Sequence, residues 1–159
     1  MTVDSNWTNN LPTIDQMGSY EHVNQYIPGT RFSDMIGPIN QYGNTGGFYM
    51  IQTATSQGQF NNFIGSDIYN SGHPLITDIR TQGNVPGFGY EHLNGWTTVN
   101  VDHIVAIWGF NFVTPGAGYI QYVEGSSAAA SNTAQGCNNY SADPFWGLVE
   151  DNSNPGQIW

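Results

Sequence analysis

The sequence contains no lysine, and its only basic side chains are Arg31 and Arg80. Charged residues make up 9% of the 159 positions, well below the roughly 25% of an average domain. The formal net charge is −10, so a phosphate backbone would be repelled and no basic patch can hold one. Anionic membranes are disfavoured for the same reason. We therefore expect neither a nucleic acid nor a membrane as a partner.

Cysteine and long apolar runs are also scarce. The single cysteine, Cys137, cannot form an internal disulfide, so its thiol is expected to stay free or to pair with another chain. No apolar run approaches the roughly 20 residues of a membrane span, and the polar start of the chain does not resemble a signal peptide. A polar, lysine-free surface is common on exported proteins. We therefore expect a secreted protein, present here in a mature or trimmed form.

What the sequence does contain favours one folded domain over residues 1–159. Its 38% hydrophobic and 14% aromatic content argues against disorder. The first half predicts a short helix near residues 12–17 and a helix from Thr30 to Gly43 that Gly37-Pro38 interrupts and kinks. A strand over 48–53 and a further helix between 56 and 71 follow, the helix ended by Gly72.

The second half predicts strands. Residues 74–80 and 119–124 alternate in polarity, and the apolar run 103–110 is expected to be a central strand that pairs antiparallel with 119–124. Residues 82–101 and 125–139 are expected to be long loops, and 145–149 a last strand. Helices followed by antiparallel strands indicate an α+β fold, with N-terminal helices packed on a C-terminal antiparallel sheet.

Three segments of the second half occur in an order that resembles a known family. Residues 72–76 read GHPLI, residues 103–111 read HIVAIWGFN, and residues 122–125 read YVEG. These segments resemble the papain-like bacterial cysteine peptidases, the superfamily of the bacteriocin-leader-processing peptidases. In that family a G-x-P-x-I strand precedes H-x-V-x-x-x-G-Y-D/N, then a turn, then Y-V-x-D-P. The resemblance covers residues 12–126 and implies a papain-like fold.

The resemblance also implies catalytic roles. A thiol nucleophile needs a base within hydrogen-bond reach and a group that orients that base. The resemblance gives His103 the role of the base and Glu124 that of the orienting carboxylate. The family's nucleophile opens a helix in a segment like C-G-P-A-S, which has no counterpart before His103, and Cys137 comes after the histidine. We therefore expect a cysteine-peptidase-like domain that is inactive as it stands, because the nucleophile is missing.

The partner implied is a peptide or protein ligand, with a separate N-terminal fragment or self-association as alternatives. A non-catalytic extracellular binding or self-assembling protein is the competing hypothesis, favoured by the abundant Asn, Gln, Gly and Tyr. A lysine-free enzyme of another class is a third.

Each candidate residue also has an ordinary structural interpretation. His103 could be a satisfied histidine at a strand edge, and Glu124 a solvated carboxylate. The spacing of His92, Asp102 and His103 matches no common metal-ligand pattern, so neither a metal nor a cofactor is expected. Aromatic side chains of the 82–101 loop are candidate ligand contacts: Phe88, Tyr90 and Trp96.

Overall fold

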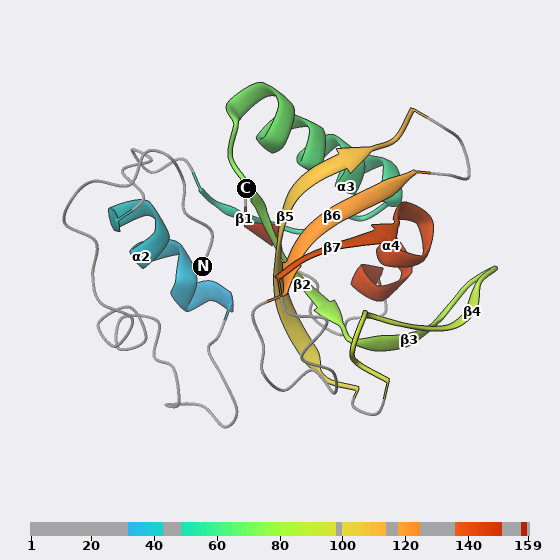
Figure 1. Ribbon diagram of the computed structural model, residues 1–159. Coiled ribbons are helices and arrows are strands. Elements are labelled where there is room, and N and C mark those ends of the chain that lie inside the picture. Colours follow the sequence, from blue (N-terminus) through green and yellow to red (C-terminus); the bar gives the residue numbers. More distant parts are fainter. Residues whose placement is uncertain are drawn as a thin grey trace.

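The computed structural model describes residues 32–42, 49–97, 100–113, 118–124, 136–150 and 157–158 (Figure 1). The helices are α2 (Phe32–Tyr42), α3 (Gln57–Ile64), the π-helix η1 (Gly65–Ser71) and α4 (Ala142–Glu150). The strands are β1 (Ile51–Gln52), β2 (Leu75–Arg80), β3 (Gln82–Val85), β4 (Gly89–His92), β5 (Asp102–Asn111), β6 (Tyr119–Glu124), β7 (Gly136–Ser141) and β8 (Gln157–Ile158).

The strands form two antiparallel sheets. The larger has six strands in the order β1-β8-β2-β5-β6-β7, and the smaller is the hairpin β3–β4. The α+β class and the antiparallel sheet predicted from the sequence are confirmed. So are the antiparallel pairing of β6 with β5 and the central place of β5 in the sheet.

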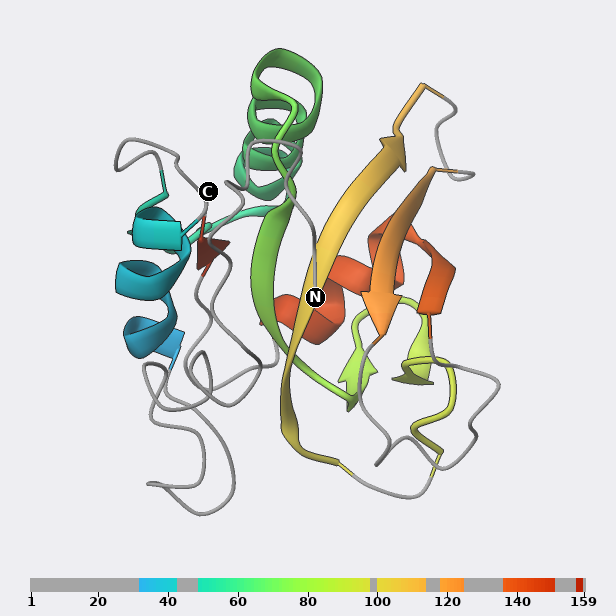
Figure 2. The same cartoon turned by 60° about the vertical axis from the view of Figure 1, so that its left-hand side comes forward.

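Alternation along the strands produces a main core on one face of the sheet. Leu75 and Ile79 of β2 and Ile107 of β5 are fully buried there. α3 and α4 cover this face with apolar side chains at helical spacing: Phe60, Phe63 and Ile64 from α3, and Phe145, Leu148 and Val149 from α4. The two helices therefore share one core with the inner face of the sheet (Figure 2).

The opposite face carries a smaller apolar cluster. Ile76 and Ile104 lie one residue away from main-core positions, so they face the other side of the sheet. Met35, Ile36 and Ile39 of α2 pack against them, together with Tyr49. The helix α2 thus covers part of the second face (Figure 1).

The helical segment predicted between residues 56 and 71 is confirmed, with its boundaries. The Ser56 hydroxyl accepts a hydrogen bond from the Gln59 backbone N–H at 3.2 Å and caps α3. The helix continues as η1 and ends at Gly72, whose φ of 71° is a left-handed conformation that glycine adopts without strain. The change from α to π geometry was not predicted.

Three predictions about element type were wrong. Residues 145–149 belong to a helix, because their apolar side chains follow helical spacing toward the main core. The interval 82–101 contains the hairpin β3–β4, and the interval 125–139 contains the start of β7. The predicted strand 48–53 is confirmed in part: β1 lies within it, and residue 48 lies outside the described residues. α4 follows the strands, so the order is not helices first throughout.

The helix α2 runs through Pro38 without the predicted interruption. Several other predictions lie outside the described residues. They concern the helix near 12–17, the cap at Thr30, the turn at 114–117 and the loop residues 125–135.

Candidate functional site

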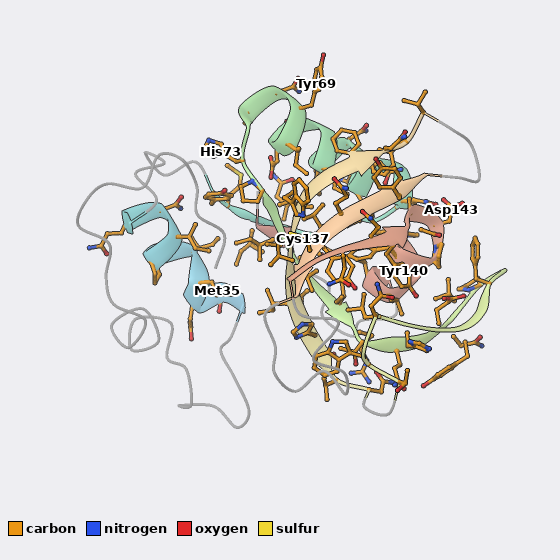
Figure 3. All side chains as sticks on the ribbon, in the orientation of Figure 1. Met35, Tyr69, His73, Cys137, Tyr140 and Asp143 are labelled. Carbon is orange, nitrogen blue, oxygen red and sulfur yellow. The ribbon has the colours of Figure 1, made fainter. Side chains whose placement is uncertain are left out.

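A cleft of about 470 Å³ lies where the hairpin β3–β4 approaches β7 and the start of α4. Figure 3 labels two of its residues, Tyr140 and Asp143. The full lining is Phe88, Glu91, His92, Asn94, Gly118, Asn139, Tyr140, Ser141, Asp143 and Pro144. Most of these side chains can donate or accept a hydrogen bond, and none is lysine or arginine. The cleft therefore suits a ligand that makes hydrogen bonds and is not strongly anionic.

The strand that lines the cleft is the end strand of the sheet. Among the described residues, β7 pairs only with β6. The Ala142 N–H donates to the Gly118 carbonyl at 2.9 Å, and Ser141 pairs with Tyr119 in the next position of the ladder. Because hydrogen-bonded and non-hydrogen-bonded pairs alternate in an antiparallel ladder, Asn139 and Ser141 direct their backbone N–H and C=O groups away from β6.

The hairpin is fastened to β7 at the cleft wall. The Tyr140 hydroxyl lies 3.0 Å from Glu91 Oε2 and 2.9 Å from the His92 carbonyl oxygen. Burial raises the pKa of Tyr140 well above its usual range, and the hydrogen bond to Glu91 acts in the same direction. The phenol therefore stays a neutral hydrogen-bond donor at physiological pH and holds the Glu91 carboxylate in the cleft.

A second carboxylate reaches the cleft from the first turn of α4. Asp143 Oδ1 accepts a hydrogen bond from Gln57 Nε2 of α3 at 2.5 Å. The described partners of Glu91 and Asp143 are thus neutral donors, and the lining contains no lysine or arginine. The nearby base Arg80 pairs instead with Asp102, at 2.7 Å across β2 and β5. The cleft therefore carries negative charge.

The side chain of Asn94 contacts the outer edge of β7. The side-chain amide of Asn94 donates to Asn138 Oδ1 at 3.3 Å and lies 3.5 Å from the Asn139 carbonyl oxygen. This second distance is at the long limit of a hydrogen bond. It shows independently that the Asn139 carbonyl points out of the sheet toward the hairpin side.

The two residues predicted as catalytic lie on neighbouring strands. His103 is on β5 opposite Ile79, half-buried, with its ring centroid 4.8 Å from that of Trp96. Glu124 ends β6 opposite Gly136, one residue beyond the last pair that β6 makes with β5, Val123 with Ala106. His103 is not among the residues that line the cleft. Their assignment as base and orienting acid stays a prediction.

The other candidates are placed as follows. Cys137 is exposed on β7 with a free thiol. Trp96 is 3% exposed and belongs to the main core, so it is not available as a ligand contact. Phe88 does line the cleft, and the Tyr90 hydroxyl donates to Gln82 Oε1 at 2.5 Å. Among the residues that the structure describes, no group of three or more His, Cys, Asp or Glu is placed to hold a metal ion.

Sequence reasoning missed the residues that form the cleft, Glu91, Tyr140 and Asp143. The segment that became β7, GCNNYS, is polar on both faces and gives no hydrophobic alternation. The apolar spacing at 145, 148 and 149 was the available signal for α4, whose first turn carries Asp143. With β7 and α4 misassigned, nothing in the sequence brought these residues together.

A third carboxylate lies away from the cleft. Asp67 is fully buried in η1, and neither of its carboxylate oxygens has a hydrogen-bond partner. Burial raises its pKa from 3.8 to about 7, because the charged form loses its hydration. The backbone carbonyl of the same residue accepts from the N–H of His73 at 2.9 Å.

Comparisons with known proteins assign no family. A scan against protein-family models found no match, and neither a search of curated proteins nor one of solved structures matched the chain. In the part of the chain that the structure describes, no helix has the length and apolar character needed to cross a membrane. A function must therefore be inferred from the cleft and from the two predicted residues.

Proposed function

We propose that this chain is an exported, cysteine-peptidase-like domain that binds peptides without cleaving them, and that the cleft beside β7 is its binding site. The observation that carries this proposal is the lining of the cleft. It combines an aromatic ring, Phe88, with amides, hydroxyls and two carboxylates. Peptides present the matching groups, since every residue brings a backbone donor and acceptor.

The size and charge of the cleft support the same proposal. Its volume of about 470 Å³ falls within the roughly 300–1,000 Å³ typical of small-ligand sites. That volume accommodates a few residues of a peptide. Glu91 and Asp143 disfavour acidic ligands.

The peptidase kinship rests on different residues. It is supported by the α+β class, by the antiparallel sheet and by the positions of His103 and Glu124 on adjacent strands. Hydrolysis by this chain alone is not expected, because its residues 1–102 contain no cysteine that could act as the nucleophile. The export of the protein rests on its composition alone, with its 9% of charged residues and absence of lysine.

A cleft-filling variant tests the binding proposal. Fluorescence anisotropy with a pool of fluorescein-labelled random decapeptides compares the unmodified chain with Asn139→Trp, which adds a bulky indole at a residue that lines the cleft. Asn62→Trp, at an exposed position of α3, is the matched control. We expect binding by the unmodified chain and by the control, with binding lost in Asn139→Trp. Equal binding by both variants, or no binding at all, would refute the proposal.

A separate experiment tests the peptidase kinship. The chain carrying Cys137→Ser is mixed with a synthetic helix containing the C-G-P-A-S segment, so that the only thiol is the supplied one. We expect faster alkylation of that thiol by iodoacetamide and hydrolysis of a peptide substrate, both abolished by His103→Gln. His73→Gln is the control, at a position without an assigned role. A thiol as unreactive as in the free helix would exclude the kinship.

The competing hypothesis of a self-assembling protein predicts a mass that rises with concentration. Light scattering over a concentration series measures it. A strict monomer at all concentrations would exclude self-assembly and leave peptide binding as the function.

A further inference from the structure

We infer that the bound peptide adds to the large sheet as a seventh strand, alongside β7, and that Glu91 and Asp143 select peptides with basic side chains. This inference rests on the proposed function, because it specifies how the cleft binds and which peptides it prefers. Its two parts, the main-chain mode and the charge preference, are supported by separate observations.

The outward-facing backbone groups of β7 support the main-chain mode. The hydrogen bond from Ala142 to Gly118 fixes the phase of the β6–β7 ladder, so that alternate residues of β7 present their N–H and C=O groups outward. Asn139 and Ser141 are two of these residues, and both line the cleft. An extended peptide lying there would find a donor and an acceptor at each of them, which is the basis of recognition by strand addition.

In the part of the chain that the structure describes, the opposite end of the sheet offers no comparable edge. There the end strand is β1, which has two residues, Ile51 and Gln52. The strand β7 has six residues, and three consecutive ones, 139–141, line the cleft. The edge with the length to pair a peptide is therefore also the edge that borders a cleft.

Among the described contacts, the one that reaches the outward backbone groups of Asn139 and Ser141 is long. The Tyr140 hydroxyl contacts Glu91 and His92 of the hairpin, and the hairpin forms a wall of the cleft. Tyr140 lies between Asn139 and Ser141, the two residues whose backbone groups point outward. The side-chain nitrogen of Asn94 lies 3.5 Å from the Asn139 carbonyl oxygen, which is long for a hydrogen bond. A peptide N–H at a normal distance of about 2.9 Å would make a stronger hydrogen bond and replace it.

The charge of the lining supports the preference for basic peptides. Glu91 is held by the Tyr140 hydroxyl and Asp143 by the Gln57 amide, both neutral donors. Neither contact neutralises the carboxylate, and the lining contains no lysine or arginine. A peptide lysine or arginine would supply the missing positive charge, while glutamate would be repelled.

The first experiment tests the main-chain mode with an acetylated and amidated hexapeptide of alternating threonine and lysine. Asn139→Pro removes an outward N–H, which an edge strand tolerates, whereas Asn139→Ala changes the side chain and keeps the N–H. We expect binding at least tenfold weaker in Asn139→Pro than in Asn139→Ala. Equal affinities would overturn strand addition, while the effect of Asn139→Trp would still report on the proposed function.

If Asn139→Pro fails to fold, the peptide takes its place as the variable. Two methylated peptides are made: one carries N-methyl groups on its odd-numbered residues and the other on its even-numbered residues. Each peptide therefore lacks every second backbone donor. We expect at least one methylated set to bind tenfold or more weakly than the parent hexapeptide. Unchanged binding of both sets would overturn the main-chain mode.

The second experiment tests the charge preference. The hexapeptide is compared with versions that carry glutamine or glutamate in place of lysine. We expect affinity to fall in the order lysine, glutamine, glutamate, with about tenfold between the first and last, and the difference to shrink in high salt. Glu91→Gln and Asp143→Asn should each reduce the lysine preference. Equal binding of the lysine and glutamine peptides would overturn this part alone.

Discussion

Replacing Asp67 by asparagine removes a buried charge from η1 and nearly preserves the shape of the side chain. The carboxylate is fully buried, and both of its oxygens lack a hydrogen-bond partner. Such a group resists ionisation in the folded state but ionises freely in the unfolded chain. The free energy of unfolding should therefore depend on pH through this residue.

The size and sign of the effect follow from the pKa of Asp67, which burial raises from 3.8 to about 7. Below pH 4 the Asp67 carboxyl is protonated in both the folded and the unfolded state, so it does not lower the free energy of unfolding through its charge. Between pH 4 and 7 the folded state binds one proton more than the unfolded state, so stability falls as pH rises. Each pH unit is worth about 1.4 kcal/mol, which gives a total loss of about 4 kcal/mol above pH 7.

Urea denaturation followed by tryptophan fluorescence, at intervals from pH 4 to pH 9, measures this loss. At each pH, the free energy of unfolding of the unmodified chain is subtracted from that of Asp67→Asn. This difference removes the contribution of the other carboxylates to the pH dependence. We expect this difference to grow by several kcal/mol from pH 4 to pH 8. At pH 4 it should be negative by about 1–3 kcal/mol, the cost of burying an asparagine amide without a partner. A difference that does not change with pH would refute the burial of an unpaired carboxylate.

Three further predictions test the packing and the exposed thiol. Gly147→Ala should cost about 1–3 kcal/mol in a urea denaturation, because its Cβ would collide with the Val85 side chain, and Val85→Ala in the same chain should recover part of that loss. Gly58→Ala in α3 should stabilise by about 0.5–1 kcal/mol, whereas Gly72→Ala should destabilise by about 1–2 kcal/mol, since a Cβ meets open space at both but only Gly72 has a positive φ. The opposite result at either glycine would contradict the assigned backbone. Cys137 should react with one equivalent of a thiol reagent without denaturant, and a thiol that reacts only on unfolding would contradict its exposure.

Much of the central sheet could be predicted from sequence, because its strands carry a strong hydrophobic signal. The apolar run of β5 and the alternation in β2 and β6 reflect the two faces of a sheet that is covered on both sides. The helical segment 57–71 was predictable for a similar reason, since Ser56 and Gly72 mark its ends. These elements combine local signals with burial.

The rest of the cleft depended on information that the local sequence does not carry. β7 is a polar edge strand, so its pairing with β6 is visible only in the tertiary structure. The hairpin β3–β4 is short and rich in Gly and Asn, which resembles a loop in sequence. Its turn uses positive φ at Gly87 and Gly89. Phe145, Leu148 and Val149 read as a strand because the segment is short, although their spacing is helical.

The candidate catalytic residues were predicted from the sequence, whereas most of the cleft residues were not. The family resemblance singled out His103 and Glu124 in advance, and they lie on adjacent strands. The cleft that the structure contains is lined by other residues. A motif can locate residues within a chain, but a concave surface is produced by segments that meet only after folding.

Amide hydrogen exchange along β7, measured by NMR with and without the threonine–lysine hexapeptide, tests the account most directly. In the free chain, we expect slow exchange at Asn138 and Tyr140, whose N–H groups bond to β6, and fast exchange at Asn139 and Ser141. Adding the peptide should slow Asn139 and Ser141 and leave the other two unchanged. Exchange at Asn139 and Ser141 that stays fast in the peptide-saturated protein would contradict strand addition at this edge.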